Sequence, residues 1–334
     1  MRIQIKAAIL GAGYIGGVHA ANLRSMEGVT LAAVCDQQIE KAERLKSDLL
    51  LSGIKLYTDF DVMLRDCDFD VLYIGIPPFA HNDQLEKAAA MGKHIFIEKP
   101  IALTTFRARS MVESIRNAGV ISQVGYHARF GYAVQKLKQL INTGEAGIPV
   151  LFDGRYDCNS TPDSWWIDRT KSGGQVFEQA IHTYDMAMYF LGEPENLTGM
   201  ITNMCHQNTS GYTIEDNSVS AIRFKSGGLA SISATNCAVP MEWNNSFTIV
   251  LEKMTAYFHD PNQAEFVFTD SNNIRRVKIN GSNDMYLEAD KTFIAAVRGE
   301  TSPFCPIEEG YKSLCLVESI MKSADQNGRN IVCE

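Results

Sequence analysis

Several features that mark particular classes of protein are missing from this chain of 334 residues. Its eight cysteines include no CxxC pair, which argues against a zinc ribbon or a secreted disulfide framework and favours reduced thiols. With a net charge of −8 and no dense run of Lys and Arg, the chain offers little to nucleic acid or an anionic membrane. The apolar stretch near the start is too short for a signal sequence or a membrane span. We therefore expect a cytoplasmic protein that binds a small molecule.

The pattern of apolar residues changes near Gln123. Before it, short apolar runs rich in β-formers, such as 70–76, alternate with amphipathic stretches, such as 104–119. That alternation predicts a parallel sheet covered by helices on both faces. After it, closely spaced strand candidates, among them 264–270 and 273–280, predict a mostly antiparallel sheet in a second α/β domain. The two expected domains are 1–122 and 123–334.

A glycine-rich turn follows the first expected strand and opens a helix. In GAGYIG, Gly11 would allow the tight turn, Gly13 would let the backbone approach a pyrophosphate, and Gly16 would permit close helix–strand packing. Asp36 ends the second strand, where a carboxylate can bind an adenosine ribose, which favours NAD over NADP. The alternatives are a turn without a ligand and a solvent-exposed aspartate. The expected cofactor contacts here are Gly11, Gly13, Tyr14, Ile15, Gly16 and Asp36.

Two later strands end in proline-containing segments. Ligands bind parallel sheets at the carboxyl ends of the strands, and proline stops the ladder and fixes the direction in which the chain leaves. Lys99, between Glu98 and Pro100, would be held at the rim of the sheet beside a nicotinamide, with an ordinary surface lysine as the alternative. His81 is expected either near the cofactor or in a packing or capping role. The cofactor contacts expected here are Ile76, Pro77, Pro78, His81, Glu98 and Lys99.

A polar stripe runs along an otherwise apolar helix in SGGQVFEQAIHTYD, residues 172–185. Glu178, His182 and Asp185 fall within roughly 60° of one another at about 100° per residue. Because the rest of the helix is apolar, its stripe must face something specific. One interpretation is a catalytic face, and another is a metal site made of carboxylate, histidine and carboxylate. A histidine satisfied within the core is the third.

These motifs together resemble those of the Gfo/Idh/MocA oxidoreductases, the family of glucose–fructose oxidoreductase and inositol 2-dehydrogenase. The likeness covers nearly the whole chain and is carried by GAGYIG with the following Asp36, by EKP at 98–100, and by GGQVFEQAIHTYD. It implies a Rossmann domain followed by an α/β domain with a large open sheet, through which members commonly oligomerise. The sequence departs from the family at Gln175, in place of a third glycine, and at Glu178, in place of an aspartate.

The resemblance implies a catalytic role for Lys99 and His182. Histidine is suited to accept the proton of a secondary alcohol near pH 7, and a lysine can stabilise the developing alkoxide, so no metal is needed. Asp185 could orient His182, and Glu178 could bind a neighbouring hydroxyl or modulate both groups. The likeness further implies that His127 and Trp165 lie near the cofactor. The remaining expected substrate contacts are Arg129, Tyr156 and Trp166.

We therefore expect an NAD-dependent oxidoreductase acting on a secondary hydroxyl of a cyclic polyol, a sugar or a sugar derivative. The expected assembly is a homo-dimer or homo-tetramer formed through the second sheet. Two alternatives stay open at this stage. One is a glycoside hydrolase that oxidises the sugar ring transiently with NAD, and the other is a non-enzymatic dinucleotide-binding regulator.

Overall fold

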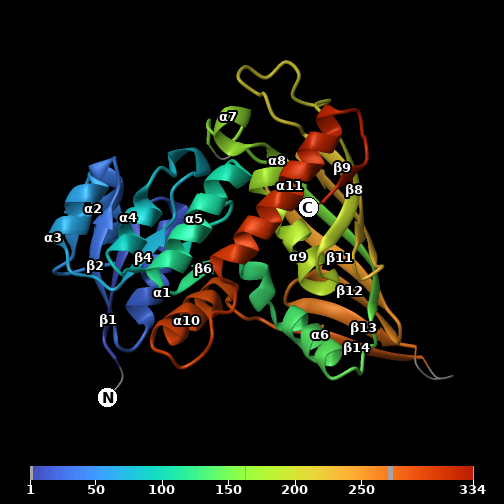
Figure 1. Cartoon of the computed structure of the whole chain (residues 1–334), viewed down its shortest axis with the longest axis horizontal. Helices are drawn as coiled ribbons and strands as arrows, with labels where there is room; N and C mark the ends of the chain where they lie inside the picture. Colours follow the sequence, from blue (N-terminus) through green and yellow to red (C-terminus); the bar gives the residue numbers. More distant parts are fainter. Residues whose placement is uncertain (1–2, 162, 270–273, 334) are drawn as a thin grey trace. The chain divides into compact units, whose positions relative to one another are not determined.

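A computed structural model describes residues 3–161, 163–269 and 274–333 of the chain. The chain forms two compact units (Figure 1), the first comprising Met1–Tyr126 and Tyr286–Tyr311, the second His127–Met285 and Lys312–Glu334. The two contiguous domains expected at 1–122 and 123–334 therefore need correction. The segment Tyr286–Tyr311 returns to the first unit because its Phe293 packs edge-on against Tyr73 and Phe96, at ring-centroid distances of 5.6 Å each.

The first unit contains a six-stranded parallel sheet with the order β3-β2-β1-β4-β5-β6. Nearly every residue of β1, β4 and β5 is buried, as expected for a parallel sheet covered on both faces. Two further elements, β3 and α3, were not predicted, because they are only 3 and 7 residues long. The strands are β1 (Ile5–Leu10), β2 (Val29–Cys35), β3 (Lys55–Tyr57), β4 (Val71–Ile74), β5 (His94–Ile97) and β6 (Ser122–Val124). The helices are α1 (Tyr14–Ser25), α2 (Ile39–Asp48), α3 (Phe60–Asp66), η1 (Pro78–Ala80), α4 (Gln84–Ala90), α5 (Thr105–Ala118) and α10 (Met285–Val297).

The second unit is built on a nine-stranded sheet with the order β14-β13-β12-β11-β7-β10-β9-β8-β15. All pairs are antiparallel except β7 with β10, which run parallel. Sequence analysis overlooked β8 and β15. The strands are β7 (Pro149–Cys158), β8 (Pro194–Thr202), β9 (Asn217–Phe224), β10 (Leu229–Thr235), β11 (Trp243–Leu251), β12 (Met254–Asp260), β13 (Gln263–Phe268), β14 (Arg275–Asn280) and β15 (Ile331–Val332). Asp270 and Asn273, at the ends of two expected strands, lie outside the described residues.

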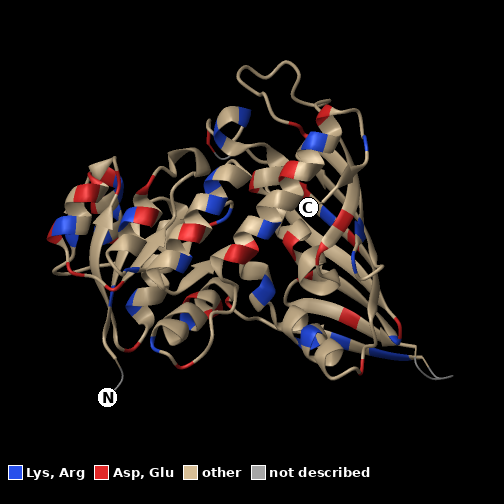
Figure 2. Ribbon diagram, in the orientation of Figure 1, with Lys and Arg blue, Asp and Glu red and all other residues tan. Residues whose placement is uncertain are grey.

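Helices cover one face of this sheet, and α6 and α9 lie on the same side of it in Figure 1. Residues of β9 alternate strictly between buried and exposed, so the opposite face carries exposed apolar side chains, including Val219, Leu229 and Leu151. Acidic and basic residues are interspersed along the elements of both units (Figure 2). The helices are η2 (His127–Phe130), α6 (Tyr132–Asn142), α7 (Arg169–Ser172), α8 (Gln175–Glu178) and α9 (Ile181–Leu191), and α11 (Ile307–Asp325) continues into this unit.

The polar stripe expected on one helix is divided between two helices. The short helix α8 ends at Glu178, and α9 begins at Ile181. The backbone between them departs from regular helix at Gln179, where φ is −109°. Glu178 therefore does not share a continuous helical face with His182 and Asp185, as the spacing had predicted.

Two of the cysteines form a disulfide, so the expectation of eight reduced thiols is wrong for this pair. Cys205 lies between β8 and β9, and Cys237 follows β10. Because β9 pairs with both β8 and β10, it brings these segments together across 32 residues of sequence. Of the helices among the described residues, none is long and apolar enough to cross a membrane.

Candidate active site

The glycine turn of the first unit has the geometry that its sequence predicts. Gly11 has φ +98°, in the region that favours glycine, and a Cβ there would lie 2.6 Å from the carbonyl oxygen of Gly75. A Cβ on Gly16 would overlap the carbonyl oxygen of Gly11. A Cβ on Gly13 would meet no described protein atom within 4 Å, so packing does not explain why this position is glycine. Its place before α1 leaves room for a ligand to approach the backbone at the helix N-terminus.

Asp36 lies beside this turn. Its carboxylate accepts a hydrogen bond from the backbone N–H of Ala12 at 2.8 Å and another from Gln38 at 2.9 Å. The turn after β1 and the end of β2 are thereby tied together. Tyr14 and Ile15 occupy the first turn of α1, where Tyr14 is exposed and Ile15 lies against Gly75.

His81 holds the two proline-containing segments of the first unit together. Its Nδ1 lies 2.7 Å from the carbonyl oxygen of Ile101, and its Nε2 lies 3.0 Å from that of Ile76. Burial lowers the pKa of His81 below its ordinary value. Of the two roles that the sequence left open, these contacts favour packing. The histidine fixes the chain after β4, which includes Pro77 and Pro78, to the chain after β5.

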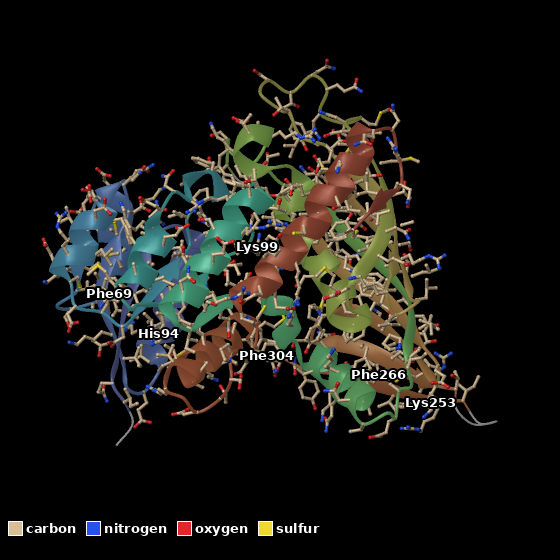
Figure 3. The ribbon with its side chains drawn as sticks, viewed as in Figure 1. Phe69, His94, Lys99, Lys253, Phe266 and Phe304 are labelled. Carbon is tan, nitrogen blue, oxygen red and sulfur yellow. A yellow bond between two sulfur atoms is a disulfide. The ribbon has the colours of Figure 1, made fainter. Side chains whose placement is uncertain are left out.

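Lys99, which is labelled in Figure 3, is the second residue after β5 and is half-buried. Its backbone N–H donates to the Glu98 carboxylate at 3.2 Å. Glu98 is buried, and a Cβ on Gly125 would overlap its carboxylate. Glu98 is therefore a buried neighbour that shapes the segment carrying Lys99.

A buried charge cluster supports this segment, and sequence analysis missed it. His19 Nε2 lies 3.2 Å from Glu98 Oε1, and His19 Nδ1 lies 2.8 Å from Asp290 Oδ1. Asn22 also donates to Asp290, at 2.8 Å. Burial alone would lower the pKa of His19, but the charges of Asp290 and Glu98 raise it to about 10. The imidazolium thus joins α1, the residue that follows β5, and α10. The available signal was a histidine on the buried face of α1, three residues after Gly16.

The second unit places two histidines side by side. His182, buried in α9, lies against His127 of η2 in an edge-to-face arrangement with ring centroids 4.6 Å apart. The helix α9 packs on β7, where a Cβ on Gly154 would clash with Thr183. The absence of a side chain at Gly154 therefore sets how closely the helix that carries His182 approaches the sheet.

Arg129 has a different partner from the one that the sequence predicted. We expected it to contact a substrate, but it is only 2% exposed and its guanidinium binds Asp185 at 2.9 and 2.7 Å. Ser313 also donates to Asp185, at 3.1 Å. This bidentate pair fixes η2, which carries His127, to α9. An effect of Asp185 on His182 stays a prediction.

A pocket within the second unit contains Glu178. The sequence-predicted residues Glu178 and Trp166 both line it. Trp165 stacks edge-to-face on Trp166 with centroids 5.9 Å apart, and both tryptophans are half-buried. Tyr156 lies on β7 with the same parity as Phe152 and Gly154, which face α9. Sequence analysis missed the other polar lining residues, which include Thr161, Gln175, Gln179 and Asn236.

Glu215 anchors the helix beside this pocket. It accepts a hydrogen bond from the backbone N–H of Val176 at 2.7 Å, at the start of α8. A Cβ on Gly174 would overlap its carboxylate, and Gly174 itself has φ +112°. Burial raises the pKa of Glu215 to about 7, although the Val176 hydrogen bond opposes the shift.

Among the residues that the structure describes, a group with the spacing of metal ligands comprises Cys205, Asp216 and Cys237. This group differs from the carboxylate–histidine–carboxylate stripe considered from the sequence. The oxygens of Asp216 already accept hydrogen bonds from the backbone N–H groups of Met204 and Cys205, and the two sulfurs are paired. Asp216 therefore caps the loop after β8 rather than offering free lone pairs.

The family models decide the classification of the chain. Residues 5–126 match a model described as an oxidoreductase family with an NAD-binding Rossmann fold, and residues 134–257 match the GFO/IDH/MocA C-terminal domain. The chain belongs to the GFO/IDH/MocA oxidoreductase family. The fold and the NAD cofactor predicted from the sequence are thereby confirmed.

Relatives within the GFO/IDH/MocA family include two inositol dehydrogenases. The scyllo-inositol 2-dehydrogenase (NAD(+)) of Bacillus subtilis is 33% identical over 239 residues, which cover 70% of this chain and 68% of that protein. The myo-inositol 2-dehydrogenase of Thermotoga maritima is 26% identical over 328 residues, covering 96% and 97%. A levoglucosan dehydrogenase in complex with NADH and L-sorbose has the same fold, with a TM-score of 0.90, 20% identity and 99% coverage of each chain.

Proposed function

We propose that this chain is an NAD-dependent dehydrogenase that moves a hydride between nicotinamide and a secondary hydroxyl of a cyclic polyol, sugar or sugar derivative. The observation that carries the proposal is that the first unit has a turn that fits a dinucleotide, with Gly13 open to a ligand, and the second unit has a buried histidine, His182, packed against His127. The curated relatives named as inositol dehydrogenases support the choice of a polyol.

In the proposed mechanism NAD, when bound, supplies the hydride acceptor. His182 takes the proton from the reacting hydroxyl in oxidation and returns it in reduction, as a general base and acid. Lys99 donates a hydrogen bond to the same oxygen and stabilises its developing negative charge. His81 and Glu98 hold the segment that carries Lys99, through the contacts to Ile76, Ile101 and the Lys99 backbone.

The other predicted residues have proposed roles in binding the cofactor or the substrate. The glycine turn, Asp36 and the segments after β4 and β5 would hold the cofactor, with His127 and Trp165 as further contacts. Glu178, Trp166 and Tyr156 would hold the substrate, and Asp185 would support His182 through the fixed position of α9. We also propose that two copies of the chain associate through the exposed face of the second sheet, where Val219, Leu229 and Leu151 leave apolar surface in the single chain.

Asp36 should decide the preference between the two nicotinamide dinucleotides. Asp36→Ala removes the carboxylate that would bind the ribose diol and repel a 2′-phosphate. We expect the ratio of kcat/KM for NAD to that for NADP to fall by about tenfold or more, since one to two kcal/mol separates the two cofactors. Asp59→Ala is the control, because Asp59 caps α3 instead. An unchanged ratio would contradict the ribose role.

The proposed reaction is tested by a substrate screen with the purified wild-type protein. Inositols, aldoses, uronates and nucleotide sugars are offered with NAD and with NADP, and nicotinamide absorbance is followed. Formation of NADH with a polyol or sugar is the expected result. Cleavage of a glycoside without net NADH would replace the proposal with the transient-oxidation hydrolase. NAD binding without turnover of any substrate would favour the non-enzymatic regulator.

A further inference from the structure

Two glutamines flank α8 in the pocket of the second unit. Gln175 is the first residue of α8 and Gln179 follows its last, so they stand four residues apart and line the same pocket. They are only 2% and 3% exposed. Buried carboxamides of this kind normally have hydrogen-bond partners at both ends.

Each of these two carboxamides is bonded at one end only. Gln175 Nε2 donates to the sulfur of Cys158 at 3.6 Å, and the same sulfur lies 3.2 Å from Gln179 Oε1. Burial raises the pKa of the Cys158 thiol to about 11, so it keeps its proton. Among the described residues, Gln175 Oε1 and Gln179 Nε2 have no hydrogen-bond partner. One is an acceptor and the other is a donor.

Asn236, in the same pocket, provides a contrast. Its Oδ1 accepts from the backbone N–H of Ser160 at 2.9 Å, and its Nδ2 donates to the Tyr212 hydroxyl at 3.2 Å. This amide is satisfied by the protein and holds the pocket wall in place. The two glutamines differ from Asn236 because one end of each carboxamide has no hydrogen-bond partner among the described residues. A buried polar group without a partner destabilises the fold.

We propose that Gln175 and Gln179 form a subsite for a hydroxyl group of a polyol that is not the reacting one. A hydroxyl donates one hydrogen bond and accepts others, so it can donate to Gln175 Oε1 while it accepts from Gln179 Nε2. The carboxylate of Glu178, between them in sequence and in the same pocket lining, accepts from an adjacent hydroxyl. The indole of Trp166 supplies an apolar surface for ring C–H groups.

The ligand class that fits is therefore a ring with hydroxyls on adjacent carbons. This inference rests on the proposed function, since it names the substrate groups that the same site recognises. A monohydroxy alcohol has no hydroxyl besides the reacting one, so it would leave both glutamine ends unpaired, and a site built to bond a hydroxyl discriminates strongly against an analogue that lacks it.

The test uses Gln175→Met and Gln179→Met, which keep the length of the side chain and remove the amide. The matched control is Gln123→Met in the first unit, because Gln123 is also buried, donates to Ala289 at 2.7 Å and has an acceptor without a partner among the described residues. Steady-state kinetics are measured with NAD and with myo-inositol, D-glucose and levoglucosan. Calorimetry measures binding of the same compounds to the protein–NADH complex.

We expect KM and the calorimetric Kd for at least one of these compounds to rise about tenfold or more in each pocket variant. The KM for NAD should stay within about twofold of wild type, and Gln123→Met should leave polyol affinity unchanged. The melting temperatures of the pocket variants should be equal to or above that of wild type, because an unpaired buried amide end has been removed. If the two glutamines had a purely structural role, the melting temperatures of the pocket variants would fall below that of wild type.

Monodeoxy derivatives of the best-bound compound are then compared in the wild-type protein and in Gln175→Met. Binding of one derivative should weaken by about tenfold, and that derivative alone should lose nothing further in Gln175→Met. Equal losses on every derivative, or unchanged polyol affinity in both variants of an active enzyme, would overturn the subsite and leave the proposed reaction intact. Polyol binding that depends on both glutamines without NADH formation would keep the subsite and overturn the reaction. If none of the compounds binds or reacts, both fail.

Discussion

His182→Ala is expected to lower the turnover of the polyol by about 10²–10⁴-fold, the range that a positioned general acid or base contributes. The affinity for NAD should change little, because the glycine turn and Asp36 belong to the first unit and His182 to α9 of the second. Turnover is measured by nicotinamide absorbance, and NAD affinity by calorimetry. Both kcat and kcat/KM should fall together, which indicates loss of an interaction made in the transition state.

Lys99→Ala is the companion to this variant and should show a loss of similar size, because an electrostatic donor to the reacting oxygen is removed. The matched controls are His259→Ala and Lys225→Ala, whose side chains are exposed on the second unit. Wild-type rates in either His182→Ala or Lys99→Ala would refute the assigned roles. A loss of NAD binding equal to the loss of turnover would point to a misfolded variant and not to a catalytic group.

The second large effect concerns stability. His19→Leu leaves Glu98 and Asp290 buried without the imidazolium that lies between them, at 3.2 and 2.8 Å. Removing one partner of a buried ion pair costs about 3–5 kcal/mol of unfolding free energy. Urea unfolding of the wild-type protein and of His19→Leu at pH 7 measures the difference in unfolding free energy. His259→Leu is the control, since that histidine is exposed on β12. A difference below about 1 kcal/mol would mean that the ion pairs of His19 with Glu98 and Asp290 give no net stabilisation.

The same cluster predicts how stability depends on pH. The pKa of His19 is about 10 in the folded protein and 6.5 as its ordinary value, so folding favours the protonated ring. The stabilisation is fully present below about pH 6.5 and is lost as the pH rises through about 10. The gap in unfolding free energy between wild type and His19→Leu should therefore narrow between pH 7 and pH 10.5. A gap that widens with pH would show that the ring is neutral in the folded state.

The features that could be predicted from the sequence are those that depend on the spacing of residues close together in the chain. The tight turn at Gly11 and the parallel sheet follow from a short motif and from the alternation of strands with helices, and the structure contains both. The ribose role of Asp36 stays a prediction. The continuous stripe through Glu178 and His182 failed because helical periodicity cannot reveal the irregular backbone at Gln179. The contacts that hold α8 include partners distant in sequence, among them Glu215, which accepts the hydrogen bond of Val176 from 39 residues away.

The other omissions involve buried polar groups whose partners are distant in sequence. Asp290 lies 271 residues from His19, and Asp185 lies 56 residues from Arg129. Sequence alone indicates that a histidine or an arginine is present, but burial and pairing appear only when the strands and helices are assembled. The resemblance to family motifs gave Lys99 and His182 their expected roles. It gave none to Gln175 and Gln179, whose place in the pocket appears only in the structure.

The return of Tyr286–Tyr311 to the first unit has a consequence for the order in which the protein folds during synthesis. At about 5–20 residues per second, the ribosome needs roughly 10–30 s after Tyr126 before Asp290 emerges. Throughout that interval the nascent Rossmann sheet lacks the carboxylate that binds His19 and the ring of Phe293 that packs on Tyr73. The NAD-binding half of the chain is therefore begun first and completed only after nearly all of the second unit has been made.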